Sequence, residues 1–139
     1  MQILKITLDA GARAPERAHP EDAGLDIFSP EAVVIPARGS AIIDTGVHVG
    51  LEHGWVGMLK SKSGLNVKHG ILSEGVVDAG YTGSIRAKLY NNSDEDYTVE
   101  MGDKITQLVI MPCATPAVVV VGGLDETERG DKGFGSTGR

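Results

Sequence analysis

The chain has 139 residues with a net charge of −6, and 41% of its residues are apolar. This length favours one domain with a substantial core, and the apolar content excludes wholesale disorder. No apolar run approaches the ~20 residues of a membrane span, so no membrane association is predicted. An acidic chain without a basic stripe also argues against nucleic-acid binding.

Short runs rich in β-branched and apolar residues follow one another along the chain, separated by Gly, Asp, Asn, Ser or Pro. They predict strands, in chain order, at residues 3–8, 32–36, 40–44, 46–51, 55–60, 83–91, 96–100, 104–111 and 117–121. Only residues 63–70 suggest a helix, with Ser63 as its N-cap and Gly70 as its stop. Many short strands and one helix predict an all-β sandwich, barrel or jelly roll.

The strand pattern ends near Gly122. We therefore expect residues 1–121 to form a β-barrel domain and residues 122–139 to form a flexible C-terminal arm.

The first residues and the cysteine count bear on the compartment. The opening MQILKITLDA lacks the basic-then-apolar order of a secretion signal. The one cysteine, Cys113, has no internal disulfide partner, which suits a reducing environment, so a cytoplasmic location is predicted. The four histidines match no zinc motif, and ordinary structural roles are expected for them.

Two segments in the first half of the chain could bind an anion or a metal. In AGLD (23–26), the ordinary interpretation is a turn, and the functional one makes Asp26 an anionic anchor near a metal. In SKSGL (61–65), Ser63 is either a helix cap or part of an anion seat at a helix start, and the two roles are compatible.

Two further segments carry polar residues in a strand context. GVVDAGYTG (75–83) predicts a β-hairpin whose tip would bring Asp78 and Tyr81 together, an arrangement suited to activating water beside a ring-shaped ligand. In GDKITQL (102–108), Gln107 is the polar residue among apolar neighbours, and simple exposure would explain it.

The C-terminal stretch RGDKGFGSTGR (129–139) has three interpretations. It could be a flexible tail, or a cell-adhesion signal spelled by RGD. It could also be a flap that closes over a phosphorylated ligand, because glycines allow close backbone approach to phosphate, while Phe134 offers a flat face to a base.

Taken in order, AGLD, SKSGL, GVVDAGY, GDKITQL and RGDKGFGSTG resemble the five motifs of the trimeric dUTP diphosphatases (dUTPases). The resemblance runs from residue 2 to residue 138. It implies a jelly-roll β-barrel homotrimer that hydrolyses dUTP to dUMP and pyrophosphate with Mg²⁺, by attack of water on the α-phosphorus. Each active site would take motifs from all three subunits, and the tail of one subunit would close a site built by the others.

The resemblance also implies residue roles. Asp78 would orient and deprotonate the attacking water, Tyr81 would pack under the deoxyribose, and Asp26 would lie near the metal through a water molecule. Backbone groups of the hairpin, including Gly75 and Val77, would read the uracil. The phosphate contacts would come from Lys62, Ser63, Gly64 and Gln107. In the tail, Arg129 would reach the terminal phosphates, Phe134 would stack on uracil, and the phosphate chain would be wrapped by Gly135, Ser136 and Thr137.

Three positions depart from the family pattern. Lys62 stands where arginine is usual, which replaces a forked cation by a point charge. Lys132 stands where a glycine is common. Gly80 replaces the second aspartate of the third motif.

Gly80 keeps two alternatives open. The related dCTP deaminases share the fold and often have glycine there. They transfer protons with a glutamate where this chain has Lys88, and a lysine ammonium cannot take the role of that carboxylate at neutral pH. The other alternative is a trimer that binds nucleotide without turnover, against which the presence of Asp78, Tyr81 and Phe134 argues.

Overall fold

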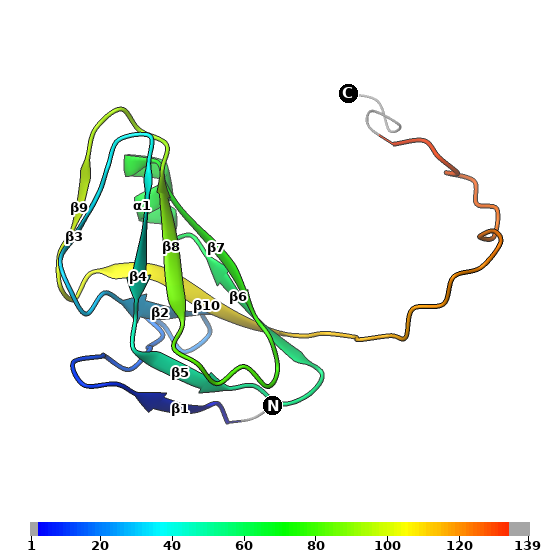
Figure 1. Cartoon of the computed structure of the whole chain (residues 1–139), viewed down its shortest axis with the longest axis horizontal. Coiled ribbons are helices and arrows are strands. Elements are labelled where there is room, and N and C mark those ends of the chain that lie inside the picture. The colour runs from blue at the N-terminus through cyan, green and yellow to red at the C-terminus, as the bar shows by residue number, and fades with distance from the viewer. Residues whose placement is uncertain (1–2, 134–139) are drawn as a thin grey trace.

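The computed structural model describes residues 3–133 and shows antiparallel strands with one short helix at one end of the sheet (Figure 1). The elements are β1 (Lys5–Leu8), β2 (Gly24–Phe28), β3 (Val33–Ile35), β4 (Ser40–Asp44), β5 (Val47–Gly50), β6 (Trp55–Lys60), α1 (Ser63–His69), β7 (Ile71–Val77), β8 (Arg86–Asn91), β9 (Tyr97–Val99) and β10 (Lys104–Pro112). Six strands form one curled sheet in the order β2-β10-β6-β7-β8-β4, and β1–β5 and β3–β9 form two smaller pairs. The all-β prediction with one short helix is confirmed.

The alternation predicted for the strand around residues 83–91 is present in β8. Ala87 and Leu89 are fully buried, whereas Arg86 and Tyr90 face solvent. Side chains that alternate between core and solvent are typical of a sheet with one buried face, which is why this strand could be recognised from sequence.

Strand β2 shows why one element was missed. The sequence interpretation placed a turn at residues 23–26, but Gly24–Phe28 form a strand that is buried at every position except the half-buried Leu25. A strand covered on both faces has no alternation to detect. The turn interpretation was therefore wrong.

The predicted strand at residues 117–121 is also wrong for the isolated chain. Residues 113–133 form neither helix nor strand, and every residue from 114 to 133 is exposed. Val118 and Val120 are 93% and 95% exposed. The sequence has the composition of a strand here, but no neighbouring strand of the same chain pairs with it.

Helix α1 begins one residue earlier than the cap prediction assumed. Lys62 occupies the N-cap and no side chain caps the first turn, so Ser63 is the first helical residue. The predicted stop is confirmed, because Gly70 adopts a left-handed conformation (φ 66°) and its N–H donates to the Asn66 carbonyl at 2.9 Å. Within residues 3–133, no helix has the length and apolar character needed to cross a membrane.

Strand β10 joins the two halves of the core. One cluster of buried side chains contains Leu108 of β10, and the other contains Ile105 of the same strand. Because β10 pairs with β2 on one side and with β6 on the other, its packing fixes the positions of both neighbours.

We expect Leu108→Ala to lower the free energy of unfolding by about 2–5 kcal/mol, because Leu108 is fully buried and its truncation leaves a cavity. Leu124→Ala is the matched control, since Leu124 is 91% exposed, and it should change stability by less than about 0.5 kcal/mol. Urea unfolding at one fixed protein concentration measures both. Equal losses in the two variants would contradict this description of the core.

Candidate functional site

A buried carboxylate with two lysines forms the centre of the first part of the site. Asp26 of β2 is 3% exposed. Its Oδ1 accepts a hydrogen bond from Nζ of Lys62, and Nζ of Lys104 lies 2.8 Å from its Oδ2. Burial raises the pKa of Asp26, but the hydrogen bonds from Lys104 and Lys62 outweigh burial, so this pKa lies below its ordinary value.

The three partners come from three separate elements. Asp26 lies opposite Gln107 in the β2–β10 ladder, and an irregularity in that ladder between Lys104 and Thr106 changes the register at the start of β10. Bulges of this kind redirect side chains. Lys62 comes from the junction between β6 and α1. Lys104 is not among the predicted site residues, and only its place in the GDK stretch before Gln107 could have signalled it.

Gln107 is not an ordinary exposed glutamine. Its Nε2 donates to the Ser61 carbonyl at 3.0 Å, which ties β10 to the start of the SKSGL segment. The amide has room because residue 24 is glycine: a Cβ at Gly24 would come within 2.0 Å of the Gln107 Oε1. The first, second and fourth motif segments therefore meet at one place.

A small polar network, missed by the sequence analysis, holds this junction. Ser61 Oγ donates to the Ser73 carbonyl at 3.1 Å and accepts from the Ser73 N–H at 2.9 Å. Ser73 Oγ donates to Thr106 Oγ1 at 2.9 Å, and both side chains are buried. Small hydroxyl residues inside otherwise apolar strands were the only available signal.

The start of α1 lies beside this network. Ser63 and Gly64 are exposed, and the first turn contains no acidic side chain. A helix start with an exposed hydroxyl and a nearby lysine suits an anion.

The loop between β7 and β8 carries the predicted Asp78 and Tyr81. The Tyr81 N–H donates to the Asp78 carbonyl at 3.1 Å, and Gly80 between them has a φ of 89°. This left-handed conformation is easy for glycine. Asp78 is exposed, and the Tyr81 hydroxyl donates to the Ser84 carbonyl at 2.9 Å.

The predicted hairpin is open rather than tight. Strands β7 and β8 pair only where Ile71–Ser73 face Leu89–Asn91. Beyond Ser73, β7 pairs with β6 alone, up to Val77 opposite Gly57. Gly75 and Val77 therefore lie at a sheet edge that β8 leaves uncovered.

The two parts of the site are apart within one chain. Val77 lies opposite Gly57, and Ser61 lies four residues further along, or about 13 Å at ~3.3 Å per residue. In Figure 1, α1 and the β7–β8 connection lie at opposite ends of the sheet. Among residues 3–133, no hydrogen bond or ion pair joins Asp78 or Tyr81 to the Asp26 cluster.

The C-terminal residues of the site are only partly described. Arg129 is exposed, and its Nε donates to the Lys132 carbonyl at 3.1 Å. Phe134, Gly135, Ser136 and Thr137 lie outside the described residues.

The described residues offer a metal ion little beyond one carboxylate. In the part of the chain from 3 to 133, no group of three or more His, Cys, Asp or Glu side chains converges. Asp26 is the acidic side chain of the cluster, and both of its oxygens face ammonium groups. Mg²⁺ commonly binds through one or two carboxylates together with substrate phosphates, so these residues fit an ion that shares its coordination with a ligand.

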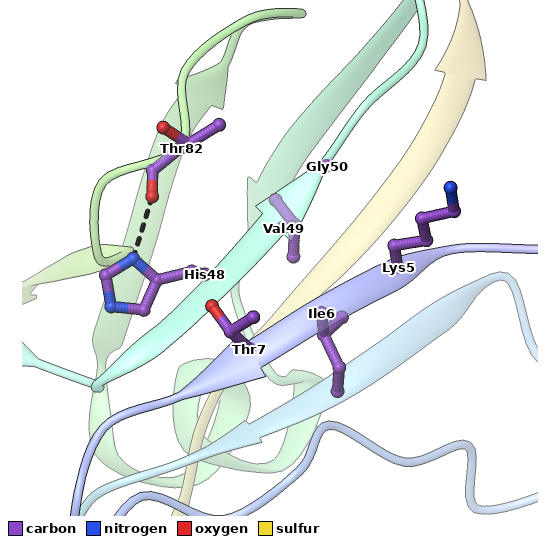
Figure 2. Close-up of a pocket in the computed structure, with 7 residues that line it drawn as sticks. All are labelled: Lys5, Ile6, Thr7, His48, Val49, Gly50 and Thr82. Carbon is purple, nitrogen blue, oxygen red and sulfur yellow. Dashed lines mark hydrogen bonds between the residues drawn. The ribbon is translucent and has the colours of Figure 1, made fainter.

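A cavity of about 220 Å³ lies between β1, β5 and Thr82 of the β7–β8 loop (Figure 2). Its lining is mainly apolar, and His48 and Lys5 contribute polar groups. None of its residues is among the predicted site residues, although it adjoins the loop that carries Asp78 and Tyr81.

Fold and site together define a β-sheet protein with lysines arranged for an anionic ligand at one end of its sheet. The sequence model of the dUTPase family matches residues 10–138. The chain is 45% identical over 138 residues to the deoxyuridine 5'-triphosphate nucleotidohydrolase of Eremothecium gossypii, covering 97% of this chain and 90% of the relative. The chain belongs to the dUTPase family, a family of enzymes, and the resemblance found in the sequence is confirmed.

Solved structures of dUTPases have the same fold. The dUTPase of Staphylococcus bacteriophage 80alpha with dUpNHpp is 36% identical with a TM-score of 0.93, and each chain is covered completely. A mutant dUTPase from phage phi11 of S. aureus, described with a structural Mg(II) ion, is 34% identical with a TM-score of 0.82, covering 89% of this chain and 99% of that one.

The lowered pKa of Asp26 predicts how stability depends on pH. A depressed carboxyl pKa means that the ion pairs stabilise the fold above the ordinary carboxyl range and that this contribution is lost as the pH falls through the lowered pKa. We expect Asp26→Asn to be less stable than the unmodified chain at neutral pH. The difference in thermal stability between the two proteins, called the gap below, should narrow toward about pH 3. Thermal unfolding midpoints across this range measure the gap.

Glu74→Gln is the control, because Glu74 pairs with Lys60 at 2.7 Å in an exposed position where ion pairs contribute little. A gap for Asp26→Asn that stayed constant with pH would rule out the charged Asp26 as the source of the stabilisation.

Proposed function

We propose that this enzyme hydrolyses dUTP to dUMP and pyrophosphate. The observation that carries the proposal is the convergence of Asp26, Lys62, Lys104 and Gln107, brought from separate motif segments to one end of the sheet. Family membership and the substrate named for the relatives support the same reaction.

The phosphate contacts are proposed for the Asp26 end of the sheet. Lys62, Ser63, Gly64 and Gln107 bind phosphate oxygens, and Lys104 adds a second ammonium. Asp26 holds both lysines in place before substrate arrives, so their positive charge faces a triphosphate without reorganisation. This neutralisation matters because the phosphate oxygens repel an incoming nucleophile.

The nucleoside contacts are proposed for the β7–β8 loop. Tyr81 packs under the deoxyribose, and the backbone groups of Gly75 and Val77 read the uracil. The open edge of β7 supports this role, because β8 does not pair with these residues.

Asp78 is proposed as the general base. Its carboxylate accepts a proton from a water molecule, whose oxygen forms a bond to the α-phosphorus. The bond from this phosphorus to the bridging oxygen breaks, and pyrophosphate leaves. Exposure of Asp78 beside the turn leaves the carboxylate accessible to water and ligand.

Asp26 is proposed as the residue that would hold Mg²⁺, through a water molecule and together with the phosphates of the substrate. When bound, Mg²⁺ would neutralise the phosphate charge and polarise the reacting phosphorus. Asp26 would then share its oxygens between the ion and the two lysines, or release one of the lysines to the phosphates.

A homotrimer is proposed as the working assembly. Val77, next to Asp78, lies opposite Gly57, which is about 13 Å along β6 from Ser61 beside the Asp26 cluster, and this separation favours a site assembled from more than one subunit. The exposed valines at 118–121 favour the same conclusion, because an apolar strand sequence without a partner in its own chain is suited to pairing with another copy.

The C-terminal residues are proposed to close the site. Residues 1–121 are proposed as the domain, with residues 113–121 joining it by pairing with another copy, and residues 122–139 are proposed as the arm. Arg129 contacts the terminal phosphates, Phe134 stacks on uracil, and the phosphate chain is wrapped by Gly135, Ser136 and Thr137. The cytoplasmic location remains a prediction from the single cysteine.

The alternatives are disfavoured by particular residues. Lys88, at the position of the deaminase glutamate, lies on β8 with its Nζ 5.0 Å from the centre of the Tyr90 ring, and a lysine side chain cannot take the role of that carboxylate. A non-catalytic binder would not need the exposed Asp78. Pyrophosphate release from dUTP and ammonia release from dCTP separate the three functions in one assay.

We expect Asp78→Asn to abolish turnover and to leave the affinity for a non-hydrolysable dUTP analogue within about threefold, because an amide cannot accept the proton but keeps the size of the side chain. Pyrophosphate release and calorimetric titration measure the two effects. Asp94→Asn is the control: Asp94 forms an exposed ion pair with Arg38, and its loss should leave both measurements unchanged. Full activity of Asp78→Asn would remove this residue from the role of base.

Deletion of residues 129–139 should cost catalysis far more than folding. The described residues of this segment are all exposed, so their loss removes little core contact, whereas the site loses its closing contacts. Pyrophosphate release, thermal unfolding and molar mass by light scattering measure the three properties. A truncated chain that no longer trimerises would contradict the assignment of this segment to closure alone.

A further inference from the structure

The imidazole of His48 lies between two groups that can only accept hydrogen bonds. Its Nδ1 is 2.8 Å from the carbonyl oxygen of Thr82, as Figure 2 shows, and its Nε2 is 3.1 Å from Oδ2 of Asp9. A neutral imidazole has one N–H and can satisfy only one of these partners. The imidazolium has two and can satisfy both.

One partner of His48 belongs to the body of the fold, and the other belongs to the loop that carries Asp78 and Tyr81. Asp9 directly follows β1 and is fixed there, because its N–H donates to the Gly46 carbonyl at 2.8 Å. Thr82 directly follows Tyr81 in the β7–β8 loop. The ring therefore connects Asp9, whose backbone is hydrogen-bonded to the body, to the loop.

The β7–β8 loop is anchored to the body at its two ends, and few hydrogen bonds hold it between them. Its far end is anchored by Ile85, whose N–H donates to the Val47 carbonyl at 2.8 Å. Toward its start, the last ladder residue is Val77, opposite Gly57. Between these anchors, within the described residues, the hydrogen bonds of the loop with the body are those of Thr82 with His48 and of Ser84 Oγ with Asp44. The Thr82 contact is the one nearer to Asp78 and Tyr81.

The charges around the ring favour its protonated form. The hydrogen bond with the Thr82 carbonyl, followed by that with Asp9, raises the pKa of His48 above its ordinary value of 6.5, and Asp44 adds a weaker attraction. Asp44 is itself shared with Ser84 and with Arg86, whose Nε lies 3.5 Å away. From β1, Lys5 lines the same cavity, but its ammonium points away from the ring in Figure 2.

We propose that His48 is a positioning residue for the nucleotide site: as an imidazolium it clamps the Thr82 carbonyl to Asp9, and its deprotonation loosens the turn that presents Asp78 and Tyr81. This inference rests on the proposed function, in which that turn binds the nucleoside. The neutral ring keeps one of the two bonds and loses the other, so that its unprotonated nitrogen faces an acceptor oxygen. The adjoining cavity of about 220 Å³ gives the released loop room to move.

The direction of the pH effect follows from the raised pKa. The clamp is fully formed below the ordinary histidine pKa and is lost as the pH rises through the raised value. Nucleotide affinity should therefore fall on the alkaline side. The sequence analysis expected only an ordinary structural role for this histidine.

Three variants test the clamp, with KM and kcat for dUTP measured from about pH 6 to about pH 9. His48→Leu should raise KM about tenfold at the acidic end while kcat stays within about twofold, because it loses the binding geometry and not the base. Asp9→Asn should keep KM low at every pH, because an asparagine amide can donate to the unprotonated Nε2 while Nδ1–H still donates to Thr82. His53→Leu is the matched control: His53 is exposed on the turn before β6, and its loss should leave the profile of the unmodified chain.

The outcomes separate this inference from the proposed function. Titration of the His48 ring and of the Thr82 amide, followed by NMR without nucleotide, should show one shared apparent pKa that disappears in His48→Leu. If the Asp9→Asn profile matched that of the unmodified chain, or if His48→Leu had an unchanged KM, the clamp would be refuted even though dUTP is hydrolysed. Failure to hydrolyse dUTP at any pH would instead refute the proposed function, and the NMR titration would still decide whether the clamp exists.

Discussion

The structure depends on a carboxylate that cannot be buried alone. Asp26 lies inside the sheet at 3% exposure, and an unpaired charge in such a place would be very unfavourable. Its two partners, Lys62 and Lys104, come from the end of β6 and the start of β10, so the charge is satisfied only when β2, β10 and the start of α1 have their native arrangement. The requirement that stabilises the fold therefore also places two ammonium groups side by side, as an anionic ligand needs.

The sheet that brings Lys62 and Lys104 to Asp26 also keeps this cluster away from the turn that carries Asp78 and Tyr81. Antiparallel pairing of β6 with β7 sends Val77 toward Gly57 and away from Ser61, so the Asp78 turn emerges at the other end. In the function we propose, a single chain thus presents two partial sites. Together with the valines exposed at 118–121, this geometry explains why an assembly of several copies is the natural form for the chemistry we propose.

The two ends of the sheet are also held differently. The Asp26 end is fixed by ion pairs and by the buried hydroxyl groups of Ser73 and Thr106. The loop that carries Asp78 is exposed and is connected to the body near Tyr81 through His48. A rigid phosphate end and an adjustable nucleoside end would let one protonation change affect the binding of the nucleoside without disturbing the cation cluster.

Local patterns in the sequence determined the strands with one buried face, such as β8, the position of the helix and its stop at Gly70, and the order of the motif segments. These features depend on neighbouring residues alone, through alternation, turn chemistry and left-handed glycine. The tertiary structure decided the rest: the strand nature of β2, whose burial on both faces hides its pattern, and the unpaired state of residues 117–121. It also decided the pairing of Lys104 with Asp26 and the position of His48 between Asp9 and Thr82. Each of these joins residues far apart in the chain, and strand register, which no local pattern records, determines which of them meet.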